Sequence, residues 1–207
     1  PKNLRFSSRT NLIKTRCVSF PKKILNQKFK EKMQYSQNDN LLIQSYFTTA
    51  FLLELKNNDF FNSDYYKNVE FEDKFVKENL PIVGIDNQGA LLMTLYTMLV
   101  IPKQLLENEF PNEFENLNET IEMINSKSES NYRKDSEKID YIRHIRNSVA
   151  HARVEFEPNI SVTFTDKNNN HEICTITIPL SKIGIFLTAL QQVFMKYIEK
   201  LKLKMTK

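Results

Sequence analysis

Hydrophobic and polar residues recur along most of the chain with the period of an α-helix. From Leu41 to Lys56 apolar side chains return every three or four positions, and similar spacing is found in residues 69–79, 90–101 and 110–125. This spacing places apolar residues on one face of a helix. We therefore expect a helical bundle, with the densely apolar third segment at its centre and a break near Pro102.

Local signals predict where the first helices begin and end. The polar run 37–40 is expected to be a loop, with Asp39 or Asn40 as the N-cap of the first helix. Apolar residues occur on nearly all faces of that helix, which predicts burial on all sides. Leu80-Pro81 is expected to end the second helix, because the residue before a proline disfavours helical geometry.

A polar segment and another helix follow. Ser126–Arg133 is rich in serine and charge, which predicts a mobile loop. Asp135 or Ser136 is then expected to cap a helix that runs to Ala150. The buried stripe of this helix is predicted to consist of Ile139, Ile142, Ile145 and Val149.

Beyond this helix the period changes to two. Apolar and polar residues alternate through 153–165 and again through 171–178, with a polar loop at 166–170. Such alternation is typical of a half-buried β-hairpin. A last amphipathic helix is expected from Lys182 to Leu203. The sequence therefore predicts a mainly α fold, a helical bundle with a β-hairpin (about 153–178) inserted before its last helix.

Length and composition favour one globular domain. The chain has 207 residues, of which 41% are hydrophobic and 26% are charged, and only three are glycine. Cys17 and Cys174 are far apart and neither belongs to a CxxC pair, which is typical of reduced thiols in the cytoplasm. No apolar run of about eighteen residues occurs, and the basic N-terminal segment is not followed by the apolar segment of a secretory signal. We therefore expect a cytoplasmic protein without a membrane partner.

Charge is segregated along the chain. Residues 1–40 carry ten Lys and Arg against two Asp and Glu, residues 41–135 carry eight against sixteen, and residues 136–207 carry eleven against seven. We interpret residues 1–39 as a basic arm with a short helix, residues 40–203 as the helical domain and residues 204–207 as a tail. The arm either binds a polyanion or only improves solubility, and the sequence leaves both readings open.

Polar chemistry is densest in the segment Arg143–His151. On an unbroken helix Arg143, Asn147 and His151 lie at i, i+4 and i+8, so they share a face opposite the isoleucine stripe. The helix is expected to end just before His151, which can then turn back toward Arg146. The same arrangement directs these groups outward from the bundle.

These residue types suit the cleavage of RNA. A ribose 2′-hydroxyl is an internal nucleophile, so the reaction requires a proton acceptor and donor near neutral pH and a cation for the charge on phosphorus. His151 supplies the proton acceptor and donor, and Arg146 supplies the cation. Asn147 donates to a non-bridging oxygen or orients the scissile group. One histidine per chain supplies only half of the acid and base, so two chains would complete the site.

The remaining polar residues have less specific interpretations. Arg143, His144 and Arg153 are candidate RNA contacts, and His144 is either a competing base or a histidine on the helix surface. An arginine and a histidine at a helix end can also simply compensate the helix dipole. The sequence has no HExxH, CxxC, GxGxxG or GxxxxGK[ST] motif. We therefore expect no metal and no cofactor.

The run Arg146-Asn147-Ser148-Val149-Ala150-His151 resembles the signature of the HEPN superfamily (higher eukaryotes and prokaryotes nucleotide-binding). That signature is an arginine, commonly followed by asparagine or another polar residue, and then a histidine a few residues later. The hairpin through Phe164-Thr165-Asp166 is similar to that of a bacterial and plasmid-borne HEPN subgroup of predicted ribonucleases. The resemblance extends over roughly residues 40–200.

The resemblance implies a metal-independent endoribonuclease that cleaves single-stranded RNA and is a homodimer with a composite active site. In this reading Arg146 and His151 are the catalytic pair and Asn147 assists them. It also implies a toxin or anti-phage (abortive infection) role with a cognate antitoxin or regulatory protein. Members silenced by adenylylation carry a tyrosine two residues after the histidine, where this chain has Arg153, so a different regulator is expected. The alternative is a non-catalytic HEPN-type dimerisation or RNA- and nucleotide-binding module.

Overall fold

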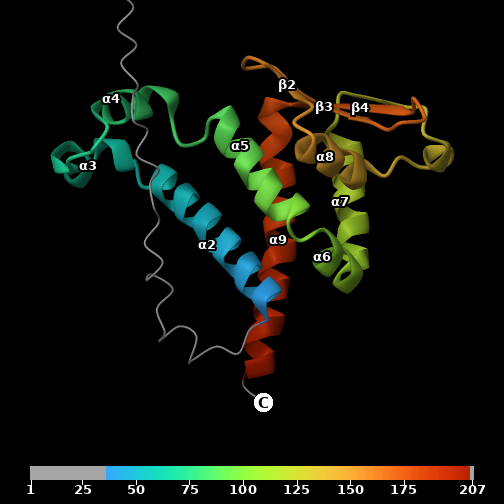
Figure 1. The fold of residues 1–207 in the computed structure, drawn as a ribbon, viewed down its shortest axis with the longest axis horizontal. Coiled ribbons are helices and arrows are strands. Elements are labelled where there is room, and N and C mark those ends of the chain that lie inside the picture. The colour runs from blue at the N-terminus through green and yellow to red at the C-terminus, as the bar shows by residue number, and fades with distance from the viewer. Residues whose placement is uncertain (1–35, 206–207) are drawn as a thin grey trace, which may run out of the picture. The chain divides into compact units, whose positions relative to one another are not determined.

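The computed structural model describes residues 36–205, which form a mainly helical domain (Figure 1). Its first part consists of α2 (Gln37–Asn57), α3 (Asp64–Asn68), α4 (Lys74–Val83), α5 (Gln88–Leu95), α6 (Lys103–Glu109) and α7 (Pro111–Ile124). Its second part consists of β1 (Lys127–Ser130), α8 (Tyr141–Ala150), β2 (Val154–Glu157), β3 (Ser161–Lys167), β4 (Ile173–Pro179) and α9 (Leu180–Met205). The predicted mainly α fold is confirmed. The predicted arm and its short helix lie outside the described residues, so the predicted domain boundaries stay predictions.

The hairpin is part of a larger antiparallel sheet whose strand order is β1-β4-β3-β2. Strand β1 pairs with β4 along its whole length, from Lys127 opposite Thr177 to Ser130 opposite Cys174. The prediction of a mobile loop at Ser126–Arg133 is therefore wrong. The sequence of β1, Lys-Ser-Glu-Ser, contains no apolar residue that would reveal a strand. Its backbone pairing with β4 is supplemented at both ends by side-chain hydrogen bonds, from Ser126 Oγ to the Thr177 carbonyl at 3.2 Å and from the Ile173 N–H to Asn131 Oδ1 at 2.5 Å.

Helix α2 begins earlier than predicted. The Ser36 side chain accepts a hydrogen bond from the Asp39 N–H, and the Asp39 side chain accepts one from the Ser36 N–H, which forms a capping box. The predicted loop at 37–40 is thus the first helical turn, and Ser36 is the N-cap. The expected burial on all sides is also wrong, because Phe47 and Phe51 are mostly exposed. Only the face that includes Leu42 and Ile43 is buried in the core.

Helix α4 passes through Pro81, where the sequence predicted a stop. The helix starts after Asp73, whose side chain accepts the N–H groups of Phe75 and Val76. Pro81 has no N–H to donate to the carbonyl of Lys77, four residues earlier. The hydroxyl of Tyr66, on α3, donates to that carbonyl at 2.6 Å. A side chain fifteen positions away therefore supplies the hydrogen bond that proline removes.

Replacing Tyr66 by phenylalanine is expected to lower the free energy of unfolding by about 1 kcal/mol, because the carbonyl of Lys77 loses its donor. The loss should shrink when Pro81→Ala restores a backbone N–H. Urea unfolding of the two single variants and the double variant measures this coupling. Tyr65→Phe is the control, because its ring is mostly exposed. Equal losses in Tyr66→Phe and Tyr65→Phe would contradict the assignment.

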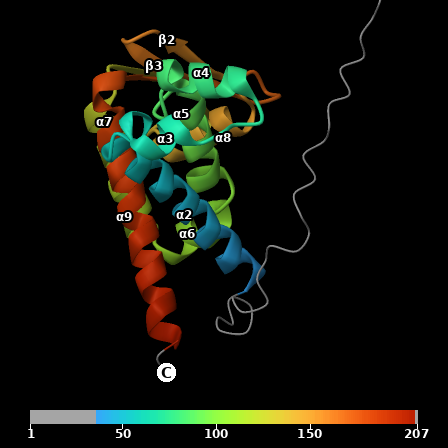
Figure 2. The same cartoon turned by 90° about the vertical axis from the view of Figure 1, so that its left-hand side faces the viewer.

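Helix α8 lies between the sheet and the other helices. It contacts β3 and β4 on one side, and α5, α7 and the π-helical turn Tyr96–Val100 on the other. After that π-helical turn the chain breaks at Ile101-Pro102, as predicted. Helix α2 crosses α9 obliquely (Figures 1 and 2), and the two helices are in contact where the ring of Tyr46 is stacked on that of Phe194. Among residues 36–205, no helix combines the length and apolar character that a bilayer span requires.

Candidate functional site

The segment singled out by the sequence forms α8, and its start differs from the prediction. Asp140 is the N-cap and accepts the N–H of Arg143 at 3.2 Å. Residues 133–135 form a short 3₁₀ turn instead of the first turn of this helix. Neither Asp135 nor Ser136 is the N-cap, because the carboxylate of Asp135 is turned inward toward His144. Of the predicted apolar stripe, Ile142, Ile145 and Val149 are buried in α8, whereas Ile139 lies before the helix and is only partly buried.

The C-terminal end of α8 presents His151 to solvent. Arg153 N–H donates to the carbonyl of Ser148 at 2.8 Å and Ala152 N–H donates to that of Val149 at 3.2 Å, which is a Schellman motif. Ala152 occupies the left-handed position at φ 53°, where glycine is the usual residue. The side chain of His151 is exposed and makes no hydrogen bond or ion pair with any described residue. It is therefore available to a substrate or to a second chain.

Arg146 is almost completely buried, with 5% of its surface exposed. Its Nη1 donates to Glu107 Oε2 at 2.7 Å, across from α8 to α6. Nε is enclosed and has no hydrogen-bond partner among the described residues. Nη2 also has no partner there but is not enclosed, so one end of the guanidinium reaches the surface. No hydrogen bond or ion pair joins Arg146 to His151 in the described part of the chain.

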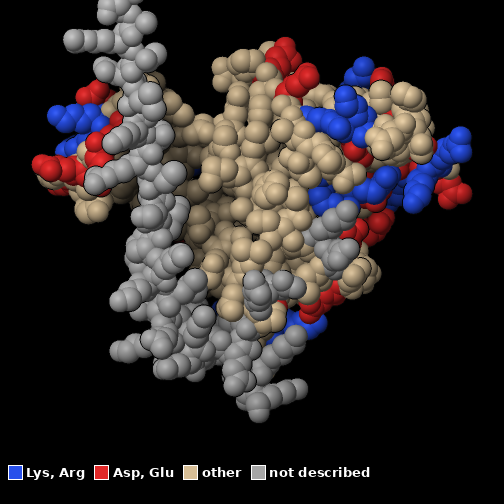
Figure 3. All heavy atoms as spheres, in the orientation of Figure 1, with Lys and Arg blue, Asp and Glu red and all other residues tan. Residues whose placement is uncertain are grey.

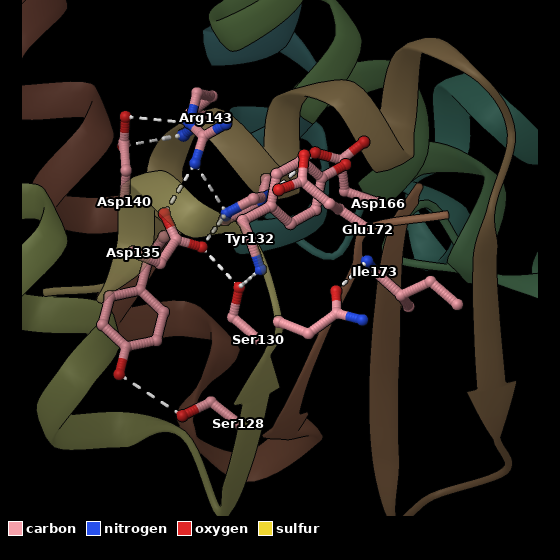
Figure 4. Close-up of polar contacts among 12 residues, drawn as sticks. Ser128, Ser130, Tyr132, Asp135, Asp140, Arg143, Asp166, Glu172 and Ile173 are labelled. Atoms are coloured by element: carbon pink, nitrogen blue, oxygen red, sulfur yellow. Dashed lines mark hydrogen bonds and ion pairs between the residues drawn. The ribbon is translucent and has the colours of Figure 1, made fainter. Parts of the chain in front are cut away.

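His144 lies in the interior between two aspartates, and none of its surface is exposed. Its Nδ1 is 2.7 Å from Asp166 Oδ2 and its Nε2 is 2.7 Å from Asp135 Oδ2. Asp135 belongs to the 3₁₀ turn and Asp166 to β3, and both carboxylates are labelled in Figure 4. The ring is thus in hydrogen-bond contact with both carboxylates, and its Nε2 also lies 2.9 Å from Arg143 Nη2. The predicted surface position of His144 is wrong, and a side chain without exposed surface makes no RNA contact.

Arg143 and Asn147 are also held by this network. Arg143 Nη2 donates to Asp135 Oδ1 at 2.7 Å, and the guanidinium lies over the ring of Tyr132 (Figure 4). Asn147 Nδ2 donates to Asp166 Oδ2 at 3.0 Å. Of the polar face predicted for α8, His151 is exposed, whereas Arg143 and Asn147 are partly buried. The carboxylates that hold Arg143 and Asn147 come from the 3₁₀ turn and from β3, and the helix sequence did not reveal them.

Arg153 follows the helix end and belongs to the edge of the sheet. Its backbone carbonyl accepts the N–H of Thr165 at 3.0 Å, and its Nη1 donates to the carbonyl of Lys167 at 2.8 Å. The side chain is only partly buried. It remains accessible beside His151 and stays a candidate RNA contact.

The buried groups of the network have altered pKa values. Burial raises the pKa of the Asp135 carboxyl, but hydrogen bonds from Ser130 and His144, together with the charge of Arg143, outweigh it, so that the pKa lies below its ordinary value. Burial, followed by the charge of Asp166, raises the pKa of Tyr132 to about 12. Burial likewise raises the pKa of the Cys174 thiol to about 12. At neutral pH the thiol is therefore protonated and the Asp135 carboxylate is ionised.

Within residues 36–205, Asp135, His144 and Cys174 form the group that could hold a metal ion, because their donor atoms lie within 4.8 Å of one another. These donors already have other partners. Nε2 of His144 is at hydrogen-bond distance from Asp135, and the Arg143 guanidinium lies 2.9 Å from the same nitrogen. A metal would have to displace this cation and remove a proton from a thiol whose pKa is raised. The group is therefore better described as an ion-pair network than as a metal centre.

A family model described as HEPN pEK499 p136 matches residues 17–201 of the chain. The chain belongs to this HEPN family. The match starts within the predicted arm and includes the whole of α8. No curated protein and no solved structure matches the chain. Membership makes this HEPN domain a nucleotide-binding or ribonuclease-type module, since HEPN domains typically bind RNA and dimerise.

The HEPN domain thus brings its predicted site residues together only in part. Arg146, Asn147 and His151 lie on one helix, but they have separate surroundings: the first pairs with Glu107, the second with Asp166, and the third is free of described partners. Glu107 and Asp166 are the two residues in contact with the motif that sequence reasoning missed. Glu107 lies in an acidic segment without a distinguishing pattern. Asp166 was expected in a hairpin loop, whereas it lies within β3 opposite Cys174.

Proposed function

We propose that this HEPN domain is a metal-independent endoribonuclease that cleaves single-stranded RNA by attack of a ribose 2′-hydroxyl. One observation supports this most directly. His151 stands exposed and without described partners at the end of the helix that carries Arg146. A histidine in this position is free to exchange protons with a substrate.

The proposed reaction needs two histidines, one from each of two chains. One imidazole takes the proton of the 2′-hydroxyl as that oxygen attacks phosphorus. The second, protonated, gives its proton to the departing 5′-oxygen, so the products are a 2′,3′-cyclic phosphate and a 5′-hydroxyl. The negative charge that builds up on the phosphoryl oxygens is met by Arg146. Because no histidine partner for His151 lies within the described residues of one chain, a homodimer with a composite site is part of the proposal.

Arg146 would act through the end of its guanidinium that reaches the surface. Its other end is fixed by Glu107, which also lines a polar pocket with Asn118, Glu115 and Lys138. A held arginine is oriented before substrate arrives, which favours the transition state over mere binding. In Figure 3 Lys and Arg side chains, interspersed with Asp and Glu, lie on the right of the view, over the region of α8 and the sheet, whereas the central face carries few charges. The Lys and Arg side chains on that side are the groups able to contact phosphates.

The cellular role proposed is that of a toxin or anti-phage (abortive infection) effector in the cytoplasm, kept inactive by a cognate antitoxin or regulatory protein. This role follows from the resemblance of the motif and hairpin to the bacterial and plasmid-borne subgroup. The Arg153 position, two residues after His151, supports a regulator other than adenylylation of a tyrosine at that place. Host toxicity on expression that disappears with His151→Ala would support this role.

A non-catalytic binding or dimerisation module is the second candidate, and the burial of Arg146 favours it. An arginine with 5% exposed surface and a carboxylate partner also fits a purely structural ion pair. The two candidates differ in whether RNA is turned over.

The test is incubation of the full chain with a single-stranded RNA in the presence of EDTA. We expect cleavage products that end in 2′,3′-cyclic phosphate or 3′-phosphate. Activity per chain should rise with protein concentration as dimers form. Binding of RNA without turnover at any concentration would favour the non-catalytic module. Cleavage that is abolished by EDTA would contradict the proposed mechanism.

A further inference from the structure

Asp166 joins the buried network to the motif. Its Oδ2 accepts hydrogen bonds from His144 Nδ1 at 2.7 Å and from Asn147 Nδ2 at 3.0 Å, across one turn of α8. The residue is 3% exposed. Its neighbours in turn are fixed, because His144 is held from the other side by Asp135. Asp166 is therefore a rigid carboxylate placed directly behind Asn147.

This contact determines which way the Asn147 carboxamide faces. The amide nitrogen Nδ2 donates to Asp166 Oδ2 at 3.0 Å, so the amide oxygen is the end of the carboxamide turned away from Asp166. The oxygen Oδ1 then points away from the network. It has no hydrogen-bond partner among the described residues, and it is not among their enclosed unpaired atoms. Asn147 thus presents an acceptor to the surface of α8.

A hydrogen-bond acceptor at this place suits a ribose 2′-hydroxyl of RNA better than a phosphoryl oxygen. Phosphoryl oxygens carry negative charge and only accept hydrogen bonds, so an amide oxygen that faces them is unfavourable. A ribose 2′-hydroxyl donates a hydrogen bond, and it is the group that distinguishes RNA from DNA. The oxygen Oδ1, as oriented by Asp166, is therefore suited to a hydroxyl donor and not to a phosphoryl oxygen.

We propose that Asp166 is a positioning residue for Asn147, and that Asn147 Oδ1 accepts a hydrogen bond from a ribose 2′-hydroxyl beside the scissile bond. This inference rests on the proposed ribonuclease function and deepens it, because it makes Asn147 a determinant of preference for RNA over DNA. The hydroxyl concerned belongs to a nucleotide that flanks the reacting ribose, since the reacting hydroxyl must give its proton to a histidine.

The test compares binding of single-stranded RNA and single-stranded DNA of the same sequence to the full chain. All measurements use the His151→Ala background, so that no RNA is cleaved. Asn147→Ala and Asp166→Asn should each lower the RNA-to-DNA affinity ratio by about 3- to 10-fold, the value of one hydrogen bond, and leave DNA affinity unchanged. The double variant should lower the ratio no further than Asn147→Ala alone, because both changes remove the same contact.

Other outcomes overturn the inference. Equal losses of RNA and DNA affinity would show a phosphate contact, and an unchanged ratio would show no role in recognition. A further loss in the double variant would show that Asp166 acts independently of Asn147. Asp64→Asn, an exposed aspartate on α3, is the matched control and should change neither affinity.

A second measurement tests the positioning role of Asp166 if the Asp166→Asn variant does not fold. In the unsubstituted chain the two carboxamide protons of Asn147, identified by their disappearance in Asn147→Ala, should give separate NMR signals with slow solvent exchange of the bonded proton. Fast exchange of both protons would overturn the positioning role.

The outcomes also separate the two proposals. RNA preference without any cleavage contradicts the ribonuclease, whereas cleavage with an insensitive RNA-to-DNA ratio contradicts only the role of Asn147.

Discussion

His151→Ala is expected to lower the rate of RNA cleavage by about 100- to 10,000-fold, the range over which general acid–base catalysis contributes. The fold should be unaffected, because the side chain is exposed and makes no described hydrogen bond, and such substitutions usually change stability by less than about 0.5 kcal/mol. Initial rates on a fluorogenic single-stranded RNA, together with thermal unfolding, measure both quantities. His171→Ala is the matched control, since His171 is an exposed histidine in the β3–β4 loop.

Arg146 offers the complementary test. Arg146→Lys keeps the positive charge but loses the planar fork that holds Glu107 and faces phosphate. We expect a fall in cleavage of about 100- to 1,000-fold, comparable to the removal of one group that stabilises developing charge. Wild-type-like activity in both His151→Ala and Arg146→Lys would rule out the proposed site. A loss in Arg146→Lys alone, with unfolding at lower temperature, would identify a structural arginine.

His144→Ala is expected to destabilise the domain by about 2–5 kcal/mol, because two buried carboxylates each lose a hydrogen-bond partner. The substitution leaves Asp135 and Asp166, both buried side chains, without the ring N–H groups between them. Urea unfolding measures the loss, with His171→Ala again as the control. Adding Asp166→Asn should recover part of the stability, because it neutralises one of the two unpaired carboxylates. A loss below about 1 kcal/mol would show that the network is not needed for folding.

The same network predicts an acid-sensitive contribution to stability. The pKa of Asp135 is lower in the folded chain than in the unfolded chain, so its contribution is present above the unfolded pKa of about 4. Below that pH the unfolded state binds more protons than the folded state, and the contribution is lost as the pH falls through the folded pKa. In His144→Ala the lowering of this pKa by the imidazole is absent, so stability should depend less steeply on pH in this range.

The repeating apolar pattern predicted the longer helices of the fold, but not the short helices α3 and α6. The stripe Ile142, Ile145 and Val149 is buried in α8 as expected. Apolar residues that recur every three to four positions share one face of a helix, and that face packs against the core. The pattern failed where stability comes from distant polar partners. Helix α4 continues through Pro81 because the Tyr66 hydroxyl replaces the missing N–H. Strand β1 has no apolar residue at all, and its pairing with β4 links positions some fifty residues apart.

The candidate site was predictable as a motif but not as a set of contacts. The spacing of Arg146, Asn147 and His151 indicated the chemistry and the end of the helix. Nothing in that segment showed that Arg146 would pair with Glu107, or that the amide nitrogen of Asn147 would donate a hydrogen bond to Asp166. Both partners lie on other elements, α6 and β3. Their positions depend on how the sheet and the helices pack around α8.

Along the chain, α8 comes after β1 and before β2, and this order has a consequence for synthesis of the protein. These two strands are the opposite edges of one sheet, and β1 has no partner until β4 has been made. As the chain leaves the ribosome, the helix that bears Arg146 and His151 emerges before Asp166 and before the strand that holds β1. Its surroundings therefore form only once the segment through Pro179 is available. A nascent chain that has reached only α8 lacks the assembled site, and so should not attack the RNA of the ribosome that is making it.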